Sequence, residues 1–158
     1  MDNCNLKNYQ ASSGSVIPVW TLEIQTVIQD VDKILDAVMQ VHPLSYGKYQ
    51  RTARISAVGM ETAQPESGST TSIHVDGFTP GQVETYPMVE LKISIERNNK
   101  ALEKVMDAIH YVHHYEEPAI LLQENWASRA NYDPNRDNPN RFWNSGRGLP
   151  DRIKDICK

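Results

Sequence analysis

The most constraining feature of this 158-residue sequence is an internal repeat. The segment VDKILDAVMQVH, which starts at Val31, aligns with LEKVMDAIHYVH, which starts at Leu102, and five of the twelve positions are identical. The offset is 102 minus 31, or 71 residues, and it also places Leu22 over Ile93 in the preceding segments. Self-similarity at a fixed offset is typical of a duplicated structural unit. We therefore expect two copies of one unit within a single domain.

Each copy has the hydrophobic periodicity of a β-α-β unit. Alternation of apolar and polar side chains predicts four strands, over residues 19–28, 49–60, 88–96 and 119–126. Spacings of three and four predict one helix from Asp30 to before Pro43, and a second from Asn98 or Asn99 to before Pro118. The order β-α-β-β-α-β predicts an α+β, ferredoxin-like fold. In that fold a four-stranded antiparallel sheet carries two helices on one face.

Three segments fall outside this pattern. Residues 1–15 are polar and predict a flexible N-terminal arm before a domain over 16–126. Residues 61–87, rich in Gly, Pro, Ser and Thr, predict a long surface loop within that domain. The C-terminal extension, 127–158, is mostly polar but contains Phe142 and Trp143 side by side. We expect it to pack on the domain or on a neighbouring subunit, because two adjacent aromatic side chains favour burial.

Net charge, apolar runs and cysteine content indicate which partners and which cellular compartment to expect. Sixteen Lys and Arg against twenty Asp and Glu give a net charge of -4, which disfavours nucleic acid as a partner. No apolar run is long enough for membrane insertion, and the first residues do not resemble a secretory signal. Cys4 and Cys157 are far apart and form no metal or redox motif. These features predict a cytoplasmic protein with reduced thiols.

Ionisable side chains are densest where the second helix ends, at His113, His114, Glu116 and Glu117. Carboxylates are disfavoured near the partial negative charge of a helix C-terminus, so they need a compensating group. Imidazole and carboxylate both bind divalent transition metals, and His113 with Glu116 is the pair we select as candidate ligands. The alternative is that these side chains are solvated or ion-paired residues of a turn.

A weaker candidate pair lies in the long loop. His74 and Asp76 are separated by one residue and could join a metal or ligand site only with help from elsewhere in the chain. The alternative is simple exposure to solvent. Their interest comes from their position in the segment that breaks the repeat.

The run HHYEEPA from His113 to Ala119 carries a family resemblance. It resembles the helix-end motif His-Pro-Tyr-Glu of the CutA divalent-cation-tolerance proteins. It is closer still to the run His-Pro-Tyr-Glu-Glu-Pro-Ala in the inserted domain of the Nif-three-like dimetal proteins, with His114 in place of the proline. Both groups share the ferredoxin-like trimer fold of the nitrogen-regulatory PII proteins. The resemblance covers about residues 20–126 and implies a homotrimer with ligand sites in clefts between subunits.

Three functions remain as hypotheses. The first is a non-enzymatic, PII-like signalling protein that senses a small ligand and contacts a regulated partner through residues 61–87. The acidic turn after the second helix lacks the glycines with which PII proteins bind nucleotide phosphates, which argues against the usual mode of ATP binding. The second is a CutA-like protein that binds a divalent metal ion, copper or zinc.

The third hypothesis is an enzyme that uses His113 and Glu116 as an acid-base pair. The sequence has no nucleophile elbow, phosphate loop or HExxH motif. Nothing in it matches the dimetal ligands of the Nif-three-like proteins, so the resemblance implies no hydrolase activity. We therefore expect a protein without enzymatic activity.

Overall fold

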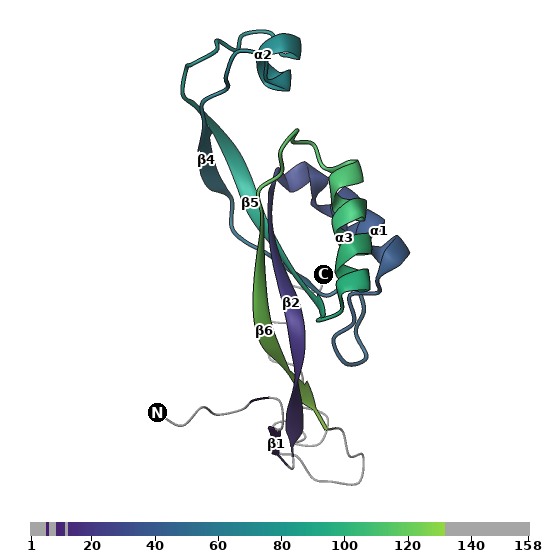
Figure 1. Ribbon diagram of the computed structural model, residues 1–158. Coiled ribbons are helices and arrows are strands. Elements are labelled where there is room, and N and C mark those ends of the chain that lie inside the picture. Colours follow the sequence, from purple (N-terminus) through teal and green to yellow (C-terminus); the bar gives the residue numbers. More distant parts are fainter. Residues whose placement is uncertain (1–5, 7–8, 12, 132–158) are drawn as a thin grey trace, which may run out of the picture.

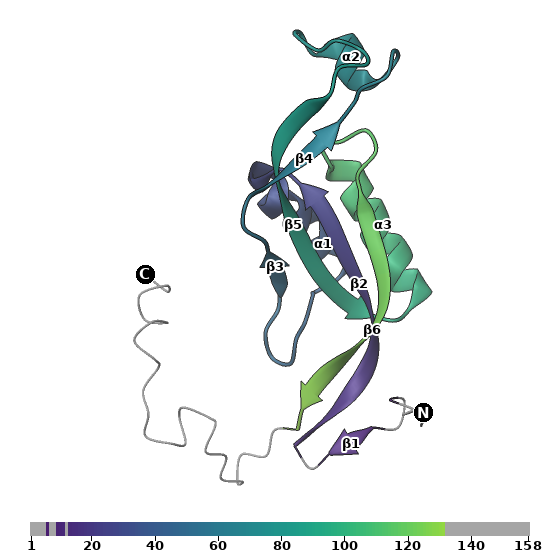
Figure 2. The ribbon, with the colours of Figure 1, turned by 90° about the vertical axis from the view of Figure 1, so that its left-hand side faces the viewer.

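One antiparallel sheet carries two longer helices on one of its faces (Figures 1 and 2). The computed structural model describes Leu6, residues 9–11 and residues 13–131. The elements are, in chain order, β1 (Gln10–Ala11), β2 (Gly14–Thr26), the 3-10 turn η2 (Ile28–Asp30), α1 (Val31–Val41), β3 (Ala53–Ile55), β4 (Gly59–Ala63), α2 (Thr70–His74), β5 (Glu84–Glu96), α3 (Asn99–Val112) and β6 (Ile120–Ala130).

The four central strands lie in the order β6-β2-β5-β3, and every neighbouring pair is antiparallel. This is the strand order of the ferredoxin-like fold, and it confirms the α+β fold expected from the repeat. The β2–β5 ladder is symmetric under the 71-residue offset. Three of its pairs show this symmetry: Leu22 with Ile93, Trp20 with Ile95, and Ile24 with Leu91.

The sheet has six strands, so the expectation of four was wrong. The segment 49–60, which we expected to form one strand, forms β3 and β4. The ladder changes at Ser56, whose N–H donates to the carbonyl of Glu90 (3.0 Å) while its Oγ accepts from the N–H of Glu90 (2.9 Å). Because a side-chain oxygen replaces a backbone carbonyl here, the strand is interrupted. The sixth strand, β1, pairs with the start of β2.

β4 and the first half of β5 form a ribbon that projects from the sheet (Figures 1 and 2). Its pairs run from Gly59–Met88 to Ala63–Glu84. The expected loop over 61–87 is therefore too long, because both of its ends are strand. Residues 64–83, which contain α2, connect β4 to β5, and we call them the tip segment. The β2–β5 ladder ends at Thr26–Val89, so Pro87 interrupts no pairing with β2.

A second ribbon lies at the opposite end of the sheet. β2 pairs with β6 from Ile24–Ile120 to Gly14–Ala130, so both strands are longer than the predicted segments 19–28 and 119–126. Part of the expected N-terminal arm is therefore strand. A Cβ on Gly14 would lie 2.7 Å from the carbonyl oxygen of Arg129, so the two strands approach too closely for any other residue.

The two longer helices begin differently. Asn98 is the N-cap of α3, and its side chain accepts hydrogen bonds from the N–H groups of Lys100 (2.9 Å) and Ala101 (3.2 Å). Asp30 occupies the same position before α1, but its side chain makes no capping hydrogen bond. Asp30 has helical backbone angles, with φ -91° and ψ -8°, because η2 runs directly into α1. Asp30 therefore occupies the N-cap position without capping α1 through its side chain.

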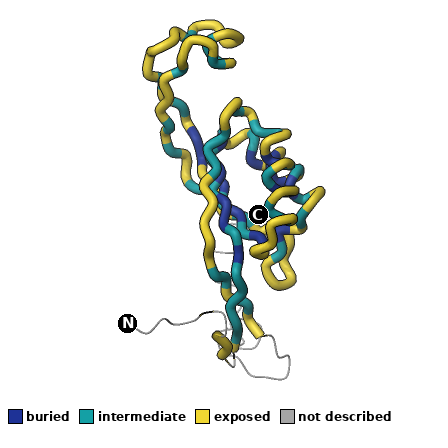
Figure 3. The backbone as a smooth tube through the Cα atoms, in the orientation of Figure 1, coloured by how far each residue is buried: buried dark blue, intermediate teal, exposed yellow. Residues whose placement is uncertain are grey.

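The core lies between the sheet and helices α1 and α3 (Figure 3). Strands β2 and β5 contribute alternate residues, and the helices contribute residues spaced by three and four. The buried apolar cluster consists of Leu22, Ile24, Val31, Ile34, Leu35, Val38, Leu44, Val89, Leu91, Ile93, Ile95, Val105 and Ile109. The tip segment is mostly exposed by contrast (Figure 3).

Two expectations concern regions beyond this core. Residues 132–158 lie outside the described residues, and so does the expected packing of Phe142 and Trp143. In the described part of the chain, no helix has the length and apolar character needed to cross a membrane.

Candidate functional site

His113 is the C-cap of α3, and its two ring nitrogens join the following turn to the end of β2. Its backbone N–H donates to the carbonyl of Ile109 (2.9 Å) and completes the last helical turn. Nδ1 accepts a hydrogen bond from the N–H of Tyr115 (3.0 Å), so the ring proton lies on Nε2, which donates to the carbonyl of Gln25 (3.0 Å). Burial lowers the pKa of His113 and so favours this neutral form.

These bonds bear on the metal-binding hypothesis for His113. A histidine binds a metal through a ring nitrogen, and both ring nitrogens of His113 already have protein partners. A cation would have to displace one of them. Within the described residues, no group of three or more His, Cys, Asp and Glu side chains could hold a metal ion. The pair His113 and Glu116 has no third protein ligand there.

Tyr115 ties the turn to the ribbon. Its hydroxyl donates a hydrogen bond to Oε2 of Glu61 on β4 (3.2 Å). Burial, helped by the negative charge of Glu61, raises the pKa of Tyr115 to about 12, so the hydroxyl keeps its proton at neutral pH. The ring of His113 packs edge-on against the ring of Tyr115, with centroids 5.1 Å apart. The side chain that reaches the ribbon is therefore oriented by the histidine that caps the helix.

Glu116 ties the same turn to the tip segment. Its Oε2 accepts a hydrogen bond from the N–H of Thr70, the first residue of α2 (2.8 Å). Hydrogen bonding to the side chain and to the backbone of Thr70 lowers the pKa of Glu116. Ser69 caps α2, and its Oγ accepts from the N–H of Ser72 (3.2 Å). We call the bonds Tyr115–Glu61 and Glu116–Thr70 the latch. Through the latch, the end of α3 holds a segment more than 40 positions earlier in the chain.

His114 and Glu117 belong to the same turn but are not part of the latch. The side chain of His114 is 69% exposed, and its Nδ1 lies 3.7 Å from Oδ2 of Asp30. That carboxylate oxygen is buried and has no hydrogen-bond partner within the described residues. A protonated His114 would place a positive charge beside it. Glu117 is exposed to solvent.

His74 and Asp76 lie in the tip segment. His74 is the last residue of α2, and Asp76 follows two residues later. Both side chains are exposed. The latch joins their segment to the turn of His113 through the first residue of α2, Thr70.

His42 is the counterpart of His113 in the first unit, at the 71-residue offset. Its N–H donates to the carbonyl of Val38 (2.8 Å), and its Nδ1 accepts from the N–H of Leu44 (3.0 Å). Its Nε2 bonds the side chain of Glu96 (2.9 Å), which lowers the pKa of that carboxyl group. Glu96 and Gln25 are themselves 71 residues apart. Each histidine therefore bonds the equivalent strand residue of the other unit.

Sequence reasoning missed the partners of the latch. Glu61 and Thr70 lie in the segment expected to form a long surface loop, and a sequence does not show which backbone N–H a side chain will bond. Gln25 was missed too, although one signal was present. The repeat aligns His42 with His113 and Gln25 with Glu96. The sequence therefore indicates that Gln25 and Glu96 occupy equivalent positions on their strands.

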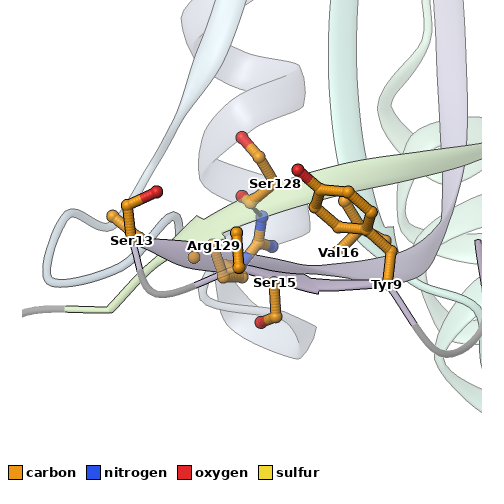
Figure 4. Close-up of a pocket in the computed structure, with 9 residues that line it drawn as sticks. Tyr9, Ser13, Ser15, Val16, Ser128 and Arg129 are labelled. Carbon is orange, nitrogen blue, oxygen red and sulfur yellow. Dashed lines mark hydrogen bonds between the residues drawn. The ribbon is translucent and has the colours of Figure 1, made fainter.

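A shallow cavity lies away from these residues, in the second ribbon, where β1 pairs with the start of β2. Its volume is about 260 Å³. Tyr9, Ser13, Ser15 and Ser128 are among the residues that line it (Figure 4). Neither the latch nor any site residue expected from the sequence lines it.

Comparison with known proteins gives a structural likeness only. The sequence matches no protein-family profile and has no significant match among curated proteins. A Bacillus cereus protein related to NIF3 superposes with a TM-score of 0.55 and 18% identity, over 72% of this chain and 27% of that one. The chain therefore spans about a quarter of that protein.

Weaker likenesses extend to two other groups. CutA1 from Ehrlichia chaffeensis has a TM-score of 0.46 and 13% identity, over 81% of this chain and 88% of that one. GlnK from B. subtilis has a TM-score of 0.43 and 12% identity, over 68% and 85%. The sequence resemblance includes the group of the NIF3-related protein. The likeness to the NIF3-related protein, together with the strand order, identifies the fold of this chain as ferredoxin-like.

Proposed function

We propose that this chain is a non-enzymatic, PII-like regulatory protein. It forms a homotrimer, senses a small ligand in clefts between subunits, and contacts a partner protein through the tip segment. The observation that carries the proposal is the latch. Tyr115 and Glu116 connect the turn after α3 to the ribbon and to α2, so a change at the turn alters how the tip is held.

The turn is well placed to respond to a ligand. It is anchored to the end of β2 by the bond from His113 to Gln25, and it also holds the tip. A ligand or subunit that moves the turn must break or strengthen the bonds to Glu61 and Thr70. Such a change in two hydrogen bonds shifts the balance between a held and a released tip. Binding of a ligand at the turn would in this way change how the tip segment contacts the partner protein.

The tip segment has the surface of a protein contact. Three aliphatic side chains on or beside it are well exposed: Ile73 (61%), Val75 (47%) and Val83 (62%). Exposed aliphatic side chains grouped on one projecting segment are typical of an interaction site. The expected role of His74 and Asp76 is to supply polar contacts at its rim.

The subunits of the trimer associate through the edge strands of the sheet. Within the described residues β6 pairs only with β2, while β3 and β4 pair only with β5, so both long edges of the sheet present unpaired backbone groups. Such edges need cover, and pairing between subunits in a closed ring supplies it. Leu121 and Leu122, which are exposed on β6, would be buried by the same contact.

A thermal-shift screen tests ligand sensing. Nucleotides, cyclic nucleotides, bicarbonate, zinc and copper are each added to the full chain and to a His113→Ala, Glu116→Ala double variant. A ligand that binds only the folded state raises its melting temperature. Stabilisation by a small organic ligand or bicarbonate that survives in the double variant supports the proposal. Stabilisation by zinc or copper that disappears there would instead identify a metal-binding protein.

A capture experiment tests the tip. Proteins retained from a lysate of the source organism by the full chain are compared with those retained by an Ile73→Asp, Val75→Asp variant. The control is Tyr111→Asp on α3, because the side chain of Tyr111 is even more exposed, at 92%. We expect the tip variant to lose at least one protein that the control retains. Identical sets of proteins would exclude the tip as the contact surface.

A further inference from the structure

The tip end of the protein is acidic as well as apolar. Between Ile55 and Leu91 the chain has no Lys or Arg. The same stretch, which includes β4, α2 and the first half of β5, carries five carboxylates: Glu61, Glu66, Asp76, Glu84 and Glu90. In sequence, the exposed aliphatic residues Ile73, Val75 and Val83 lie between Glu66 and Glu84. A surface of this kind attracts a segment that is both basic and apolar.

The sequence itself contains such a segment. Residues 138–150, NPNRFWNSGRGLP, include Arg141 and Arg147 and no acidic residue. Phe142 and Trp143 lie between these two cations. Aromatic side chains and Arg are the residue types that most often anchor a protein interface. We call residues 138–150 the basic segment.

Chain length decides which copy of the basic segment can reach the tip. β6 ends at Ala130, at the opposite end of the sheet from the tip (Figure 1). From there to Glu84 the sheet extends along ten residues of β6 and about seven of β5, or roughly 55 Å at 3.3 Å per residue. The twelve residues from Asn131 to Phe142 reach at most about 43 Å from Ala130. Phe142 of the same chain therefore falls short.

We infer that the tip segment binds the basic segment of a second copy of this chain. Phe142 and Trp143 pack against the exposed aliphatic side chains of α2 and its surroundings, while Arg141 and Arg147 pair with the carboxylates. The contact is head to tail, because the tip and the end of β6 lie at opposite ends of one subunit. It rests on the proposed function, since it requires the tip to be a protein-binding surface, and it names the first partner of that surface.

Photo-crosslinking in the full chain tests the contact. A benzophenone amino acid replaces Ile73, and protein labelled with ¹⁵N is mixed with unlabelled protein before irradiation at low ionic strength. We expect mass spectrometry to find position 73 joined to residues 138–150 of the other isotope. A control probe at Tyr111, which is 92% exposed on α3, should give no such product. Products joined only to the same isotope, or only to other segments, would overturn the inference.

Charge reversal tests the pairing without relying on a single variant. Arg141→Glu with Arg147→Glu should reduce the crosslinked product at least fivefold, and Glu66→Arg with Glu84→Arg should do the same. Combining the four substitutions should restore most of it, because the two surfaces are again complementary. Addition of about 0.5 M salt should weaken the wild-type contact by screening. Loss of product in all three variants would contradict an electrostatic pairing.

The outcome is separable from that of the proposed function. If position 73 never joins the basic segment while the Ile73→Asp, Val75→Asp variant still loses captured proteins, the tip is a contact surface for another partner and this inference fails alone. If neither experiment responds to changes at the tip, the proposed function fails as well.

Discussion

The turns that follow α1 and α3 begin in the same way and lead to different parts of the molecule. His42 and His113 both cap a helix and both accept a hydrogen bond on Nδ1 from the N–H two residues later. After His42 that residue is Leu44, whose side chain is buried in the core. After His113 it is Tyr115, which reaches out to Glu61 on the ribbon.

This difference separates what the fold needs from what is specific to the second unit. A turn held by a histidine ring serves both units, so it is part of how the repeated element folds. The latch occurs after α3 alone, where Tyr115 and Glu116 replace Leu44 and Ser45 at the same offset. The shared histidines therefore hold both turns, whereas the residues that follow His113 make the bonds that join the turn to the ribbon and to α2.

The first prediction compares the two histidines directly. His113→Ala should lower the free energy of unfolding by about 2–4 kcal/mol, because it leaves the N–H of Tyr115 and the carbonyl of Gln25 without partners. His42→Ala should cost about 1–2 kcal/mol, because water can solvate the carboxylate of Glu96, which is 57% exposed. Urea denaturation of both variants measures the difference. Equal losses would show that the two turns are equivalent.

A change in pH should have an intermediate effect on the free energy of unfolding, through the titration of His113. Folding lowers its pKa below the ordinary value of 6.5, so the unfolded chain binds the proton more readily. The stability due to neutral His113 is complete above 6.5 and is lost as the pH falls from there to the lower pKa of the folded state.

Unfolding free energies measured between about pH 7.5 and pH 5 should therefore decline. The decline should be weaker in His113→Asn, which keeps an acceptor for the N–H of Tyr115 but has no titrating ring. The lowered pKa values of Glu96 and Glu116 act only below their ordinary 4.5 and do not affect this range. An unchanged pH profile in the Asn variant would contradict the assignment.

The next prediction concerns the starts of the two helices. Asn98→Ala removes two capping bonds of α3 and should cost about 1 kcal/mol. Asp30→Ala removes no capping bond of α1, so any loss there must come from another cause. Thermal unfolding of the two variants checks the difference. A larger loss for Asp30→Ala would mean that its contact with His114 stabilises the fold more than a helix cap does.

The smallest effect on global stability is expected at the latch itself. Glu116→Ala should leave the unfolding midpoint nearly unchanged but speed hydrogen exchange at the N–H of Thr70 and along α2. Glu117→Ala is the matched control, because Glu117 is the adjacent exposed carboxylate. Equal exchange in both variants would remove Glu116 from the latch.

Much of the fold could be predicted because periodicity and the repeat report on burial. The alternation in 88–96 and the helical spacing after Val31 reflect side chains that face one core, and that core is the one observed. The split at Ser56 could not be predicted, because it depends on one hydroxyl that meets the backbone of Glu90. The extension of β2 to Gly14 was also missed, because Pro18 and Gly14 weaken the strand pattern.

The candidate site, too, could be predicted only in part. The repeat alone marks His113 to Glu117 as unusual, because this turn breaks its symmetry. The partners of these residues follow from the three-dimensional fold, since Glu61 and Thr70 reach the turn through a ribbon formed by long-range strand pairing. Local patterns record which face of an element is buried. They do not record which distant backbone group a side chain will meet, because that depends on how the elements pack in three dimensions.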